Sequence, residues 1–410
     1  MSNSVASSYL FGDAAAARFF PRSFRDPSDR RQAVSEAAKR RCSPQLLAVL
    51  RRQNERFGAN ALRHQRIEAL ERGSCAVVFT GQQVGLFGGP LYSFHKALSA
   101  IAVARQLEAE SGTAVIPIFW LQTEDHDFAE IACCYAPGPD RSVTRFAVDE
   151  SDPAGSERRS VASRVLGAGV DAALAALDAC CEGLADWSAT GEILRRHYCP
   201  EARWADAFAG LFAELFADDG LLLFDPRVPD VAALASDVHR RAIDERAAIE
   251  ATLAARAEQL AAAGFDVQIP IRPGCALSFF HPDGPTGPRF RLTAAPDGWA
   301  LAGDPRRFTT AAIDSALRER PLSFSTSALL RPLLQDQLFP TAAIVGGPGE
   351  LAYFAELAPL YELFELPMPL CTPRGRFAIV EPRLASQLDE WALCAEDLAR
   401  PDEELARHFR

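Results

Sequence analysis

Residues 77–96 have the sequence VVFTGQQVGLFGGPLYSFHK, in which a short apolar run passes into four glycines and then into an amphipathic segment. The apolar residues from Cys75 to Phe79 fit a buried parallel strand. After Pro90, which suits a first helical turn, apolar residues recur at helical spacing. Glycines at such a junction let the backbone approach a ligand, and the helix N-terminus offers free N–H groups to an anion. The segment therefore predicts a strand, a binding loop and a helix, with a tight turn that binds nothing as the alternative.

A second glycine-rich turn lies in the other half of the chain. Residues 341–345 form an apolar run that leads into Gly346-Gly347-Pro348-Gly349-Glu350 and a helical pattern through Leu363. Further strands are predicted at 114–120, 220–224 and 368–371. If these strands are parallel, both glycine-rich turns lie at the same edge of the sheet and face one cleft. Neither turn has the spacing of a phosphate-binding loop or of the dinucleotide fingerprint.

The pattern along the chain predicts a discontinuous α/β core. The regions are an N-terminal helical arm (1–74), a first part of the core with helical insertions (75–265), a small antiparallel β-hairpin insertion (266–305), a second part of the core (306–383) and a charged helical segment (384–410).

Composition excludes several classes of function. The 410 residues are 48% hydrophobic and carry a formal net charge of −11, which disfavours binding to nucleic acid or to an anionic membrane. Without a long apolar run or a signal-peptide pattern at the N-terminus, the chain is predicted to be cytoplasmic. Ten cysteines include no Cys-x-x-Cys pair, so we assign no metal ligands and expect small buried thiols. Small molecules are the expected partners.

An acidic cluster follows the second predicted strand. Within seven residues it holds four carboxylates and one imidazole: Glu124, Asp125, His126, Asp127 and Glu130. Such a cluster suits general acid–base chemistry or a magnesium ion. The alternative is a helix N-terminus whose amides the carboxylates cap.

Two cations are candidates for binding a substrate carboxylate. Lys96 follows the first glycine-rich turn by two helical turns, although a lysine at the surface is the more ordinary explanation. Arg331 could bind a carboxylate bidentately, or it could pair with Asp336.

Three segments make the chain resemble the BshC family, the bacillithiol synthase family of cysteine-adding ligases. They are TGQQVGLFGGPLY at 80–92 with Lys96, FWLQTEDHDFAE at 119–130, and LRPLLQDQLFP at 330–340 continuing through GGPGE at 346–350. The resemblance extends from about residue 50 to residue 383.

The resemblance implies a Rossmann-like parallel sheet with helices on both faces, small subdomains, and a helical coiled coil through which the family dimerises. The implied activity is the last step of bacillithiol synthesis, which joins L-cysteine to the amine of glucosaminyl malate. Residues 384–410 would be the start of a truncated coiled coil, which leaves a homodimer open. The reaction type implies ATP/ADP and magnesium as activator, without an assignable site.

Carried over residue by residue, the resemblance places eleven residues at the cleft. His126, or Asp127 acting with it, would be the base, and Arg331 and Lys96 would bind carboxylates. The implied catalytic residues are Asp125, His126 and Asp127, and the implied substrate-binding residues are Gln82, Gln83, Tyr92, Lys96, Arg331, Asp336, Gly346 and Gly347.

Two other classes of function fit the same pattern. A nucleotidyl- or glycosyl-transferase could use Asp-His-Asp at a strand end, and a non-catalytic binding protein could descend from the ligase. Analogy of fold alone does not separate them.

Overall fold

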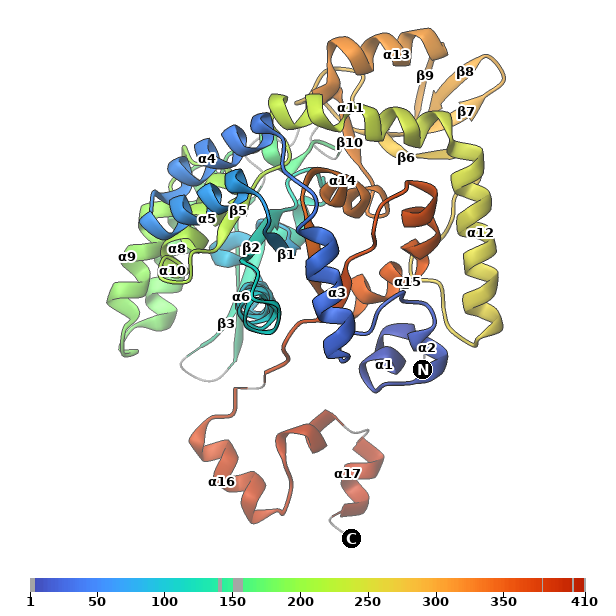
Figure 1. The fold of residues 1–410 in the computed structure, drawn as a ribbon. Coiled ribbons are helices and arrows are strands. Elements are labelled where there is room, and N and C mark those ends of the chain that lie inside the picture. Colours follow the sequence, from blue (N-terminus) through green and yellow to red (C-terminus); the bar gives the residue numbers. More distant parts are fainter. Residues whose placement is uncertain (1–3, 139–141, 150–157, 378, 400–401, 409–410) are drawn as a thin grey trace. The chain divides into compact units, whose positions relative to one another are not determined.

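The computed structural model describes residues 4–138, 142–149, 158–377, 379–399 and 402–408 (Figure 1). The chain divides into two units, Met1–Arg374 and Gly375–Arg410. The second unit, in the segment predicted to begin a coiled coil, holds two short helices and a 3₁₀ turn: α16 (Pro382–Glu390), η4 (Ala395–Ala399) and α17 (Asp402–His408). None of the helices in the described ranges is long and apolar enough to cross a membrane.

The core of the first unit is a five-stranded sheet with the order β12-β11-β1-β2-β5. All four pairings are parallel, and Phe79 lies opposite both Ile118 and Ile344. The predicted parallel α/β fold is therefore confirmed. The strands are β1 (Ala76–Gln82), β2 (Val115–Leu121), β5 (Leu222–Phe224), β11 (Thr341–Gly346) and β12 (Leu370–Pro373).

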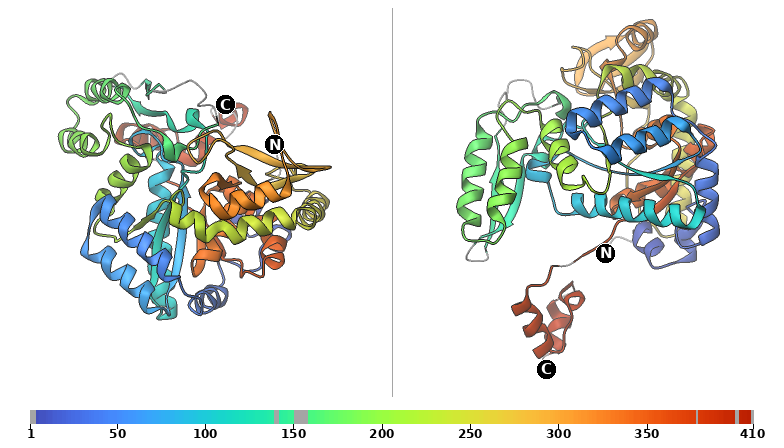
Figure 2. Two further views of the ribbon diagram at one scale, coloured as in Figure 1. Left: turned by 90° about the horizontal axis from the view of Figure 1, so that it is seen from above. Right: turned by 60° about the vertical axis from the view of Figure 1, so that its left-hand side comes forward.

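Helices cover both faces of this sheet (Figure 2). Alternate residues of a strand point to opposite faces, so Val77 and Phe79 join one apolar cluster while Ala76 and Val78 join another. The first cluster includes residues of α14 (Leu330–Leu338) and α15 (Pro348–Leu363), and the second includes residues of α3 (Pro27–Ala37) and α6 (Tyr92–Ser111). Burial on both faces explains why the strands are almost wholly apolar.

The N-terminal region is helical, but it is part of the core rather than an arm. Besides α3 it contains α1 (Val5–Leu10), α2 (Ala14–Ala17), α4 (Pro44–Gly58) and α5 (Ala61–Arg72). On α4, the Gln53 side chain exchanges hydrogen bonds of 2.7 and 3.0 Å with the backbone of Asp225, and Asn54 exchanges two of 3.0 Å with Leu223. These two amides satisfy the free edge of β5 as a further strand would.

A helical subdomain is inserted between β2 and β5. It begins with α7 (Phe128–Ile131) and a hairpin that the sequence did not predict, β3 (Cys133–Pro137) with β4 (Val143–Ala147). It continues through η2 (Val161–Ser163) and three helices: α8 (Gly169–Cys181), α9 (Trp187–His197) and α10 (Trp204–Leu215).

The second insertion is larger than the predicted hairpin. The helices α11 (Pro229–Asp244) and α12 (Arg246–Ala262) lead to a five-stranded antiparallel sheet with the order β10-β6-β7-β8-β9. We call residues 275–326 the antiparallel module. The predicted end at residue 305 is too early, because the module includes β6 (Cys275–Phe280), β7 (Phe290–Ala295), β8 (Gly298–Leu301), β9 (Asp304–Phe308), α13 (Thr310–Glu319), η3 (Pro321–Ser323) and β10 (Phe324–Thr326).

Candidate functional site

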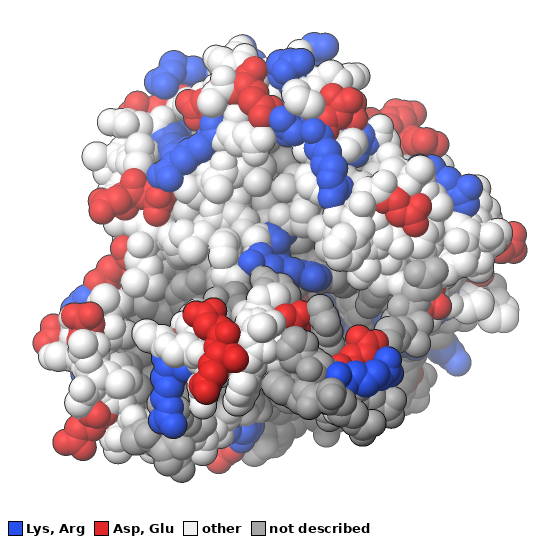
Figure 3. All heavy atoms as spheres, turned by 90° about the horizontal axis from the view of Figure 1, so that it is seen from below, with Lys and Arg blue, Asp and Glu red and all other residues white. Residues whose placement is uncertain are grey.

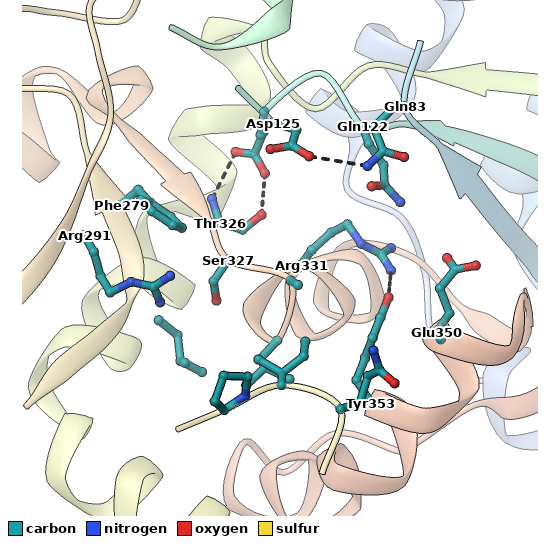
Figure 4. Close-up of a pocket in the computed structure, with 18 of the residues that line it drawn as sticks. Gln83, Gln122, Asp125, Phe279, Arg291, Thr326, Ser327, Arg331, Glu350 and Tyr353 are labelled. Atoms are coloured by element: carbon teal, nitrogen blue, oxygen red, sulfur yellow. Dashed lines mark hydrogen bonds between the residues drawn. The ribbon is translucent and has the colours of Figure 1, made fainter. Parts of the chain in front are cut away.

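A cavity of about 780 Å³ lies in the first unit, where the carboxyl ends of the parallel strands face the antiparallel module. Side chains that follow β1 and β2 line one part of it, and the N-terminus of α15 lines another. Phe279 of β6 and Arg291 of β7 line the opposite wall (Figure 4). Ligands of open α/β sheets bind outside these strand ends, so the position of the cavity fits a ligand site.

The structure brings eight of the eleven predicted residues to this cavity. They are Gln82, Gln83, Tyr92, Lys96, Asp125, His126, Arg331 and Gly347. Both glycine-rich turns thus contribute to one cleft, as their positions in the sequence predicted.

The other three predicted residues do not line the cavity. Asp127 caps α7, where its Oδ1 accepts a hydrogen bond of 3.3 Å from the Glu130 amide. Gly346 is the last residue of β11, and its carbonyl accepts a 2.9 Å bond from the Arg374 amide. Asp336 is fully buried behind the site. The cap explanation of the acidic cluster is therefore right for Asp127, while Asp125 faces the cavity.

Lys96 is buried and is not a surface lysine; only 3% of it is exposed. Its ammonium donates to the Gly81 carbonyl at 2.8 Å and to Gln82 Oε1 at 2.9 Å, and it forms an ion pair with Glu350. Glu350 also accepts a 2.9 Å bond from the Gly347 amide at the start of α15. Burial lowers the pKa of Lys96, and the ion pair with Glu350 offsets part of that effect. Lys96 therefore joins the two glycine-rich turns.

Asp125 and His126 form a cluster with Arg289, which precedes β7. Arg289 donates to Asp125 Oδ1 at 2.9 Å and to His126 Nδ1 at 3.1 Å from Nε and 2.9 Å from Nη2. Because a guanidinium can only donate, Nδ1 carries no proton, and a neutral His126 holds its proton on Nε2. Burial alone would raise the pKa of Asp125, but the hydrogen bond of 2.7 Å from the His126 backbone amide and the charge of Arg289 hold it below its usual value. Asp125 is thus an ionised carboxylate beside an imidazole donor.

Two further carboxylates at the cavity have raised pKa values. Burial raises the pKa of Glu124, which accepts hydrogen bonds from the amide and hydroxyl of Thr326 in the module. Burial, followed by repulsion from Asp125 and Asp127, raises the pKa of Glu130. Gln83 donates to Glu130 at 2.8 Å and to Asp125 at 3.4 Å. Asp125 and Glu130 are therefore neighbouring carboxylates whose proton affinities are shifted in opposite directions.

Arg331 does not pair with Asp336. Its guanidinium donates to Tyr353 Oη at 2.9 Å and to Gln335 Oε1 at 3.1 Å. Asp336 accepts from Gln335 Nε2 at 2.9 Å and from the Tyr361 hydroxyl, so it acts through Gln335 to hold the arginine in place. Burial raises the pKa of Tyr353 to about 12, which keeps the phenol neutral beside Arg331.

Several lining residues were not predicted as site residues, among them Phe279, Arg289, Arg291 and Tyr353. Two signals could have found them: Arg289 and Arg291 alternate along a strand after a turn, and Tyr353 lies one helical turn after Glu350. Over the face drawn in Figure 3, basic side chains are interspersed with acidic ones. In the part of the chain that the structure describes, no group of three or more His, Cys, Asp or Glu side chains could hold a metal ion.

Fold and site together define an α/β protein with a small-molecule cavity at the carboxyl edge of a parallel sheet. A family model described as bacillithiol biosynthesis BshC, N-terminal Rossmann-like domain, matches residues 1–375. The chain belongs to the BshC family, and the Rossmann-like fold implied by the three segments is confirmed.

Curated relatives support the same conclusion. The chain is 34% identical to a protein of Salinibacter ruber over 93% of its own length, 36% identical to one of Koribacter versatilis over 86%, and 32% identical to one of Chlorobaculum tepidum over 84%. Each of the three is named "Putative cysteine ligase BshC". These names agree with the predicted ligase class. The aligned part covers 69%, 64% and 60% of the three relatives, so the chain spans about two thirds of their length.

Proposed function

We propose that this chain is a cysteine ligase that joins the carboxyl group of L-cysteine to the amine of glucosaminyl malate. The observation that carries the proposal is the Asp125–His126–Arg289 cluster, which brings an ionised carboxylate and an imidazole donor to the cavity of a BshC family member.

The carboxylates suit an amine substrate. An ammonium group is attracted by the ionised Asp125, but it must lose a proton before its lone pair can attack an acyl carbon. Glu130 has the higher proton affinity of the two neighbouring carboxylates, because its pKa is raised while that of Asp125 is lowered. We therefore assign Glu130 as the base and Asp125 as the residue that holds the amine. This replaces His126 or Asp127 as base, since Arg289 occupies the Nδ1 lone pair of His126 and Asp127 caps α7.

His126 is assigned as a donor. With the proton on Nε2, its imidazole can donate to an acyl oxygen as negative charge develops there. Arg289 fixes this tautomer and is itself 6% exposed, so water competes little for its hydrogen bonds.

Amide formation from a free carboxylate needs an activated acyl group, and ATP with magnesium is the activator that the reaction type requires. The described cavity does not fit a triphosphate at the start of α15, where the Glu350 carboxylate pairs with Lys96 and caps Gly347. The described residues therefore define no nucleotide site.

The proposal is tested by incubating the chain with glucosaminyl malate and L-cysteine, with and without ATP and magnesium, and measuring bacillithiol by mass spectrometry. Glu130→Gln should abolish product formation. The matched control is Glu362→Gln, an exposed residue on α15 away from the cavity. Bacillithiol at equal rates from Glu130→Gln and the unmodified chain would overturn the base assignment. Release of pyrophosphate without incorporation of cysteine would favour a transferase, and binding of glucosaminyl malate without any turnover would favour a binding protein.

A further inference from the structure

The cations of the cavity differ in whether a protein group already satisfies them. Lys96 pairs with Glu350, Arg289 with Asp125, and Arg331 donates to Gln335 and Tyr353. These three are held by the protein before any ligand arrives. The three N–H groups of Lys96 are all engaged, whereas Arg289 and Arg331 each keep further N–H groups beyond these contacts.

Arg291 is different. It lies on β7 and lines the cavity, half-buried, with its guanidinium 4.9 Å from the centre of the Phe279 ring. Among the described residues, no carboxylate lies within ion-pair distance of the Arg291 guanidinium. None of them accepts a hydrogen bond from the guanidinium N–H groups either. Figure 4 shows Arg291 and Phe279 on one side of the cavity and Tyr353 and Glu350 on the other.

A second arginine adds to this charge. Arg272, in the segment before β6, also lines the cavity and also has no carboxylate partner among the residues that the structure describes. Burial lowers the pKa of Arg291, and repulsion from Arg272 lowers it further, so the two guanidiniums act on each other. Both guanidiniums face one cavity, and although solvent screens the exposed Arg272, an anion bound between them is attracted by both.

We propose that Arg291 and Arg272 form a subsite for a short dicarboxylate, which in the substrate is the malyl group. This rests on the proposed function for the identity of the substrate, but the subsite itself is defined by the two arginines. A guanidinium can bind one carboxylate through two parallel hydrogen bonds. Two guanidiniums from separate segments can therefore bind the two carboxylates of one short dicarboxylate.

The subsite determines the orientation in which the substrate lies in the cavity. The malyl group lies at the module, against Arg291 and the Phe279 ring, and the amino sugar extends toward Asp125 and Glu130 at the sheet edge. The antiparallel module then selects the substrate, while the sheet edge supplies the acid–base groups. Lys96 and Arg331, which the resemblance assigned to carboxylate binding, instead build the wall of the site.

The test measures binding of L-malate to the full chain by isothermal titration calorimetry, which needs no turnover. Arg291→Gln should weaken L-malate binding at least tenfold, and Arg291→Lys should weaken it less. Arg318→Gln, an exposed arginine on α13, is the matched control and should bind L-malate like the unmodified chain. Thermal unfolding of each variant establishes that it is folded.

A monocarboxylate and inorganic phosphate are titrated beside L-malate. L-Lactate should bind at least tenfold more weakly than L-malate, because its single carboxylate can pair with only one of the two guanidiniums. Equal L-malate binding by Arg291→Gln and the unmodified chain would overturn the proposal, as would phosphate binding more tightly than L-malate and being lost in the same variant. A chain that binds L-malate through Arg291 but makes no bacillithiol would retain the subsite and lose the ligase function, so the two failures are distinguishable.

Discussion

The two walls of the cavity differ in how their charges are used. On the sheet wall, the motif residues Lys96 and Glu350 neutralise each other, and Arg331 is held by Tyr353 and Gln335. On the module wall, Arg291 has no such partner among the described residues. The motif pair Lys96–Glu350 therefore holds the backbone of the sheet wall in place, whereas the guanidinium of Arg291 on the module wall is held by neither a carboxylate nor a hydrogen bond among the described residues.

The largest expected effect comes from breaking the pair on the sheet wall. Lys96→Met leaves Glu350 as an unpaired carboxylate beside the buried Gly81 and Gln82, and removing one partner of a buried pair costs about 3–5 kcal/mol of unfolding free energy. Urea unfolding measures this loss. The control is Arg105→Met on the same helix, where an exposed pair with Asp219 is worth less than about 1 kcal/mol.

A double variant separates charge from packing. Adding Glu350→Gln to Lys96→Met removes the unpaired carboxylate while keeping an acceptor for the Gly347 amide, so more than half of the lost stability should return. If the double variant is as unstable as Lys96→Met alone, packing of the lysine stem and not its charge stabilises this wall.

His126 connects the two walls through Arg289, and its role can be tested by the choice of replacement. Removing a donor to a developing oxyanion costs about 100-fold in rate. His126→Ala should therefore lower the rate of bacillithiol formation by about that factor, whereas His126→Gln, whose amide can still donate, should lose less. His64→Ala on α5 is the control. Equal losses in His126→Ala and His126→Gln would mean that the imidazole transfers a proton.

The two walls also differ in how much of each could be predicted from the sequence. Strands and glycine-rich turns have local signatures, so the parallel sheet and the meeting of both turns at one cavity followed from residues 75–96 and 341–350. The pairings of charges have no local signature. Asp336 is five residues from Arg331, yet it contacts Tyr361 and Gln335 instead, because only side chains three or four residues apart face each other on a helix.

The module wall was missed for a related reason. Arg289 directly precedes β7 and Arg291 lies on it, the partners of β7 come from both sides in the sequence, and the prediction ended the module at residue 305, before β10. Only the folded arrangement brings the start of β7 close to the residues that follow β2, as the contact between Arg289 and Asp125, 164 residues apart in the chain, illustrates.

Glycine substitutions test the close packing of the sheet wall on a smaller scale. A Cβ at Gly81 would lie 2.7 Å from the Trp120 carbonyl oxygen, on the backbone of β2, whereas a Cβ at Gly349 would meet nothing within 4 Å. Gly81→Ala should cost about 1–3 kcal/mol of unfolding free energy, the usual range for overpacking, and Gly349→Ala should be close to neutral. Equal stabilities of the two variants in urea would mean that β1 and β2 can separate without cost.

A pH-dependent effect concerns Glu356, which links the walls. It lies on α15, yet its carboxylate accepts hydrogen bonds from the amides of Gln268 and Ile269, at 2.8 and 3.1 Å, in the segment that leads to Arg272. Burial raises the pKa of Glu356 to about 7. Because the folded state holds the proton more tightly, this group destabilises the fold as the pH rises from its unfolded value of about 4.5 to about 7.

Glu356→Gln removes this titration while keeping an acceptor for both amides. The unfolding free energy of the variant relative to the unmodified chain should therefore rise with pH between 5 and 7, by at most about 1.4 kcal/mol for each pH unit, and level off above pH 7. Urea unfolding at pH 5, 6, 7 and 8 measures it, with Glu362→Gln as the exposed control on the same helix. A flat difference would mean that ionised Glu356 is well solvated, and that the segment before the module is held to α15 equally at every pH.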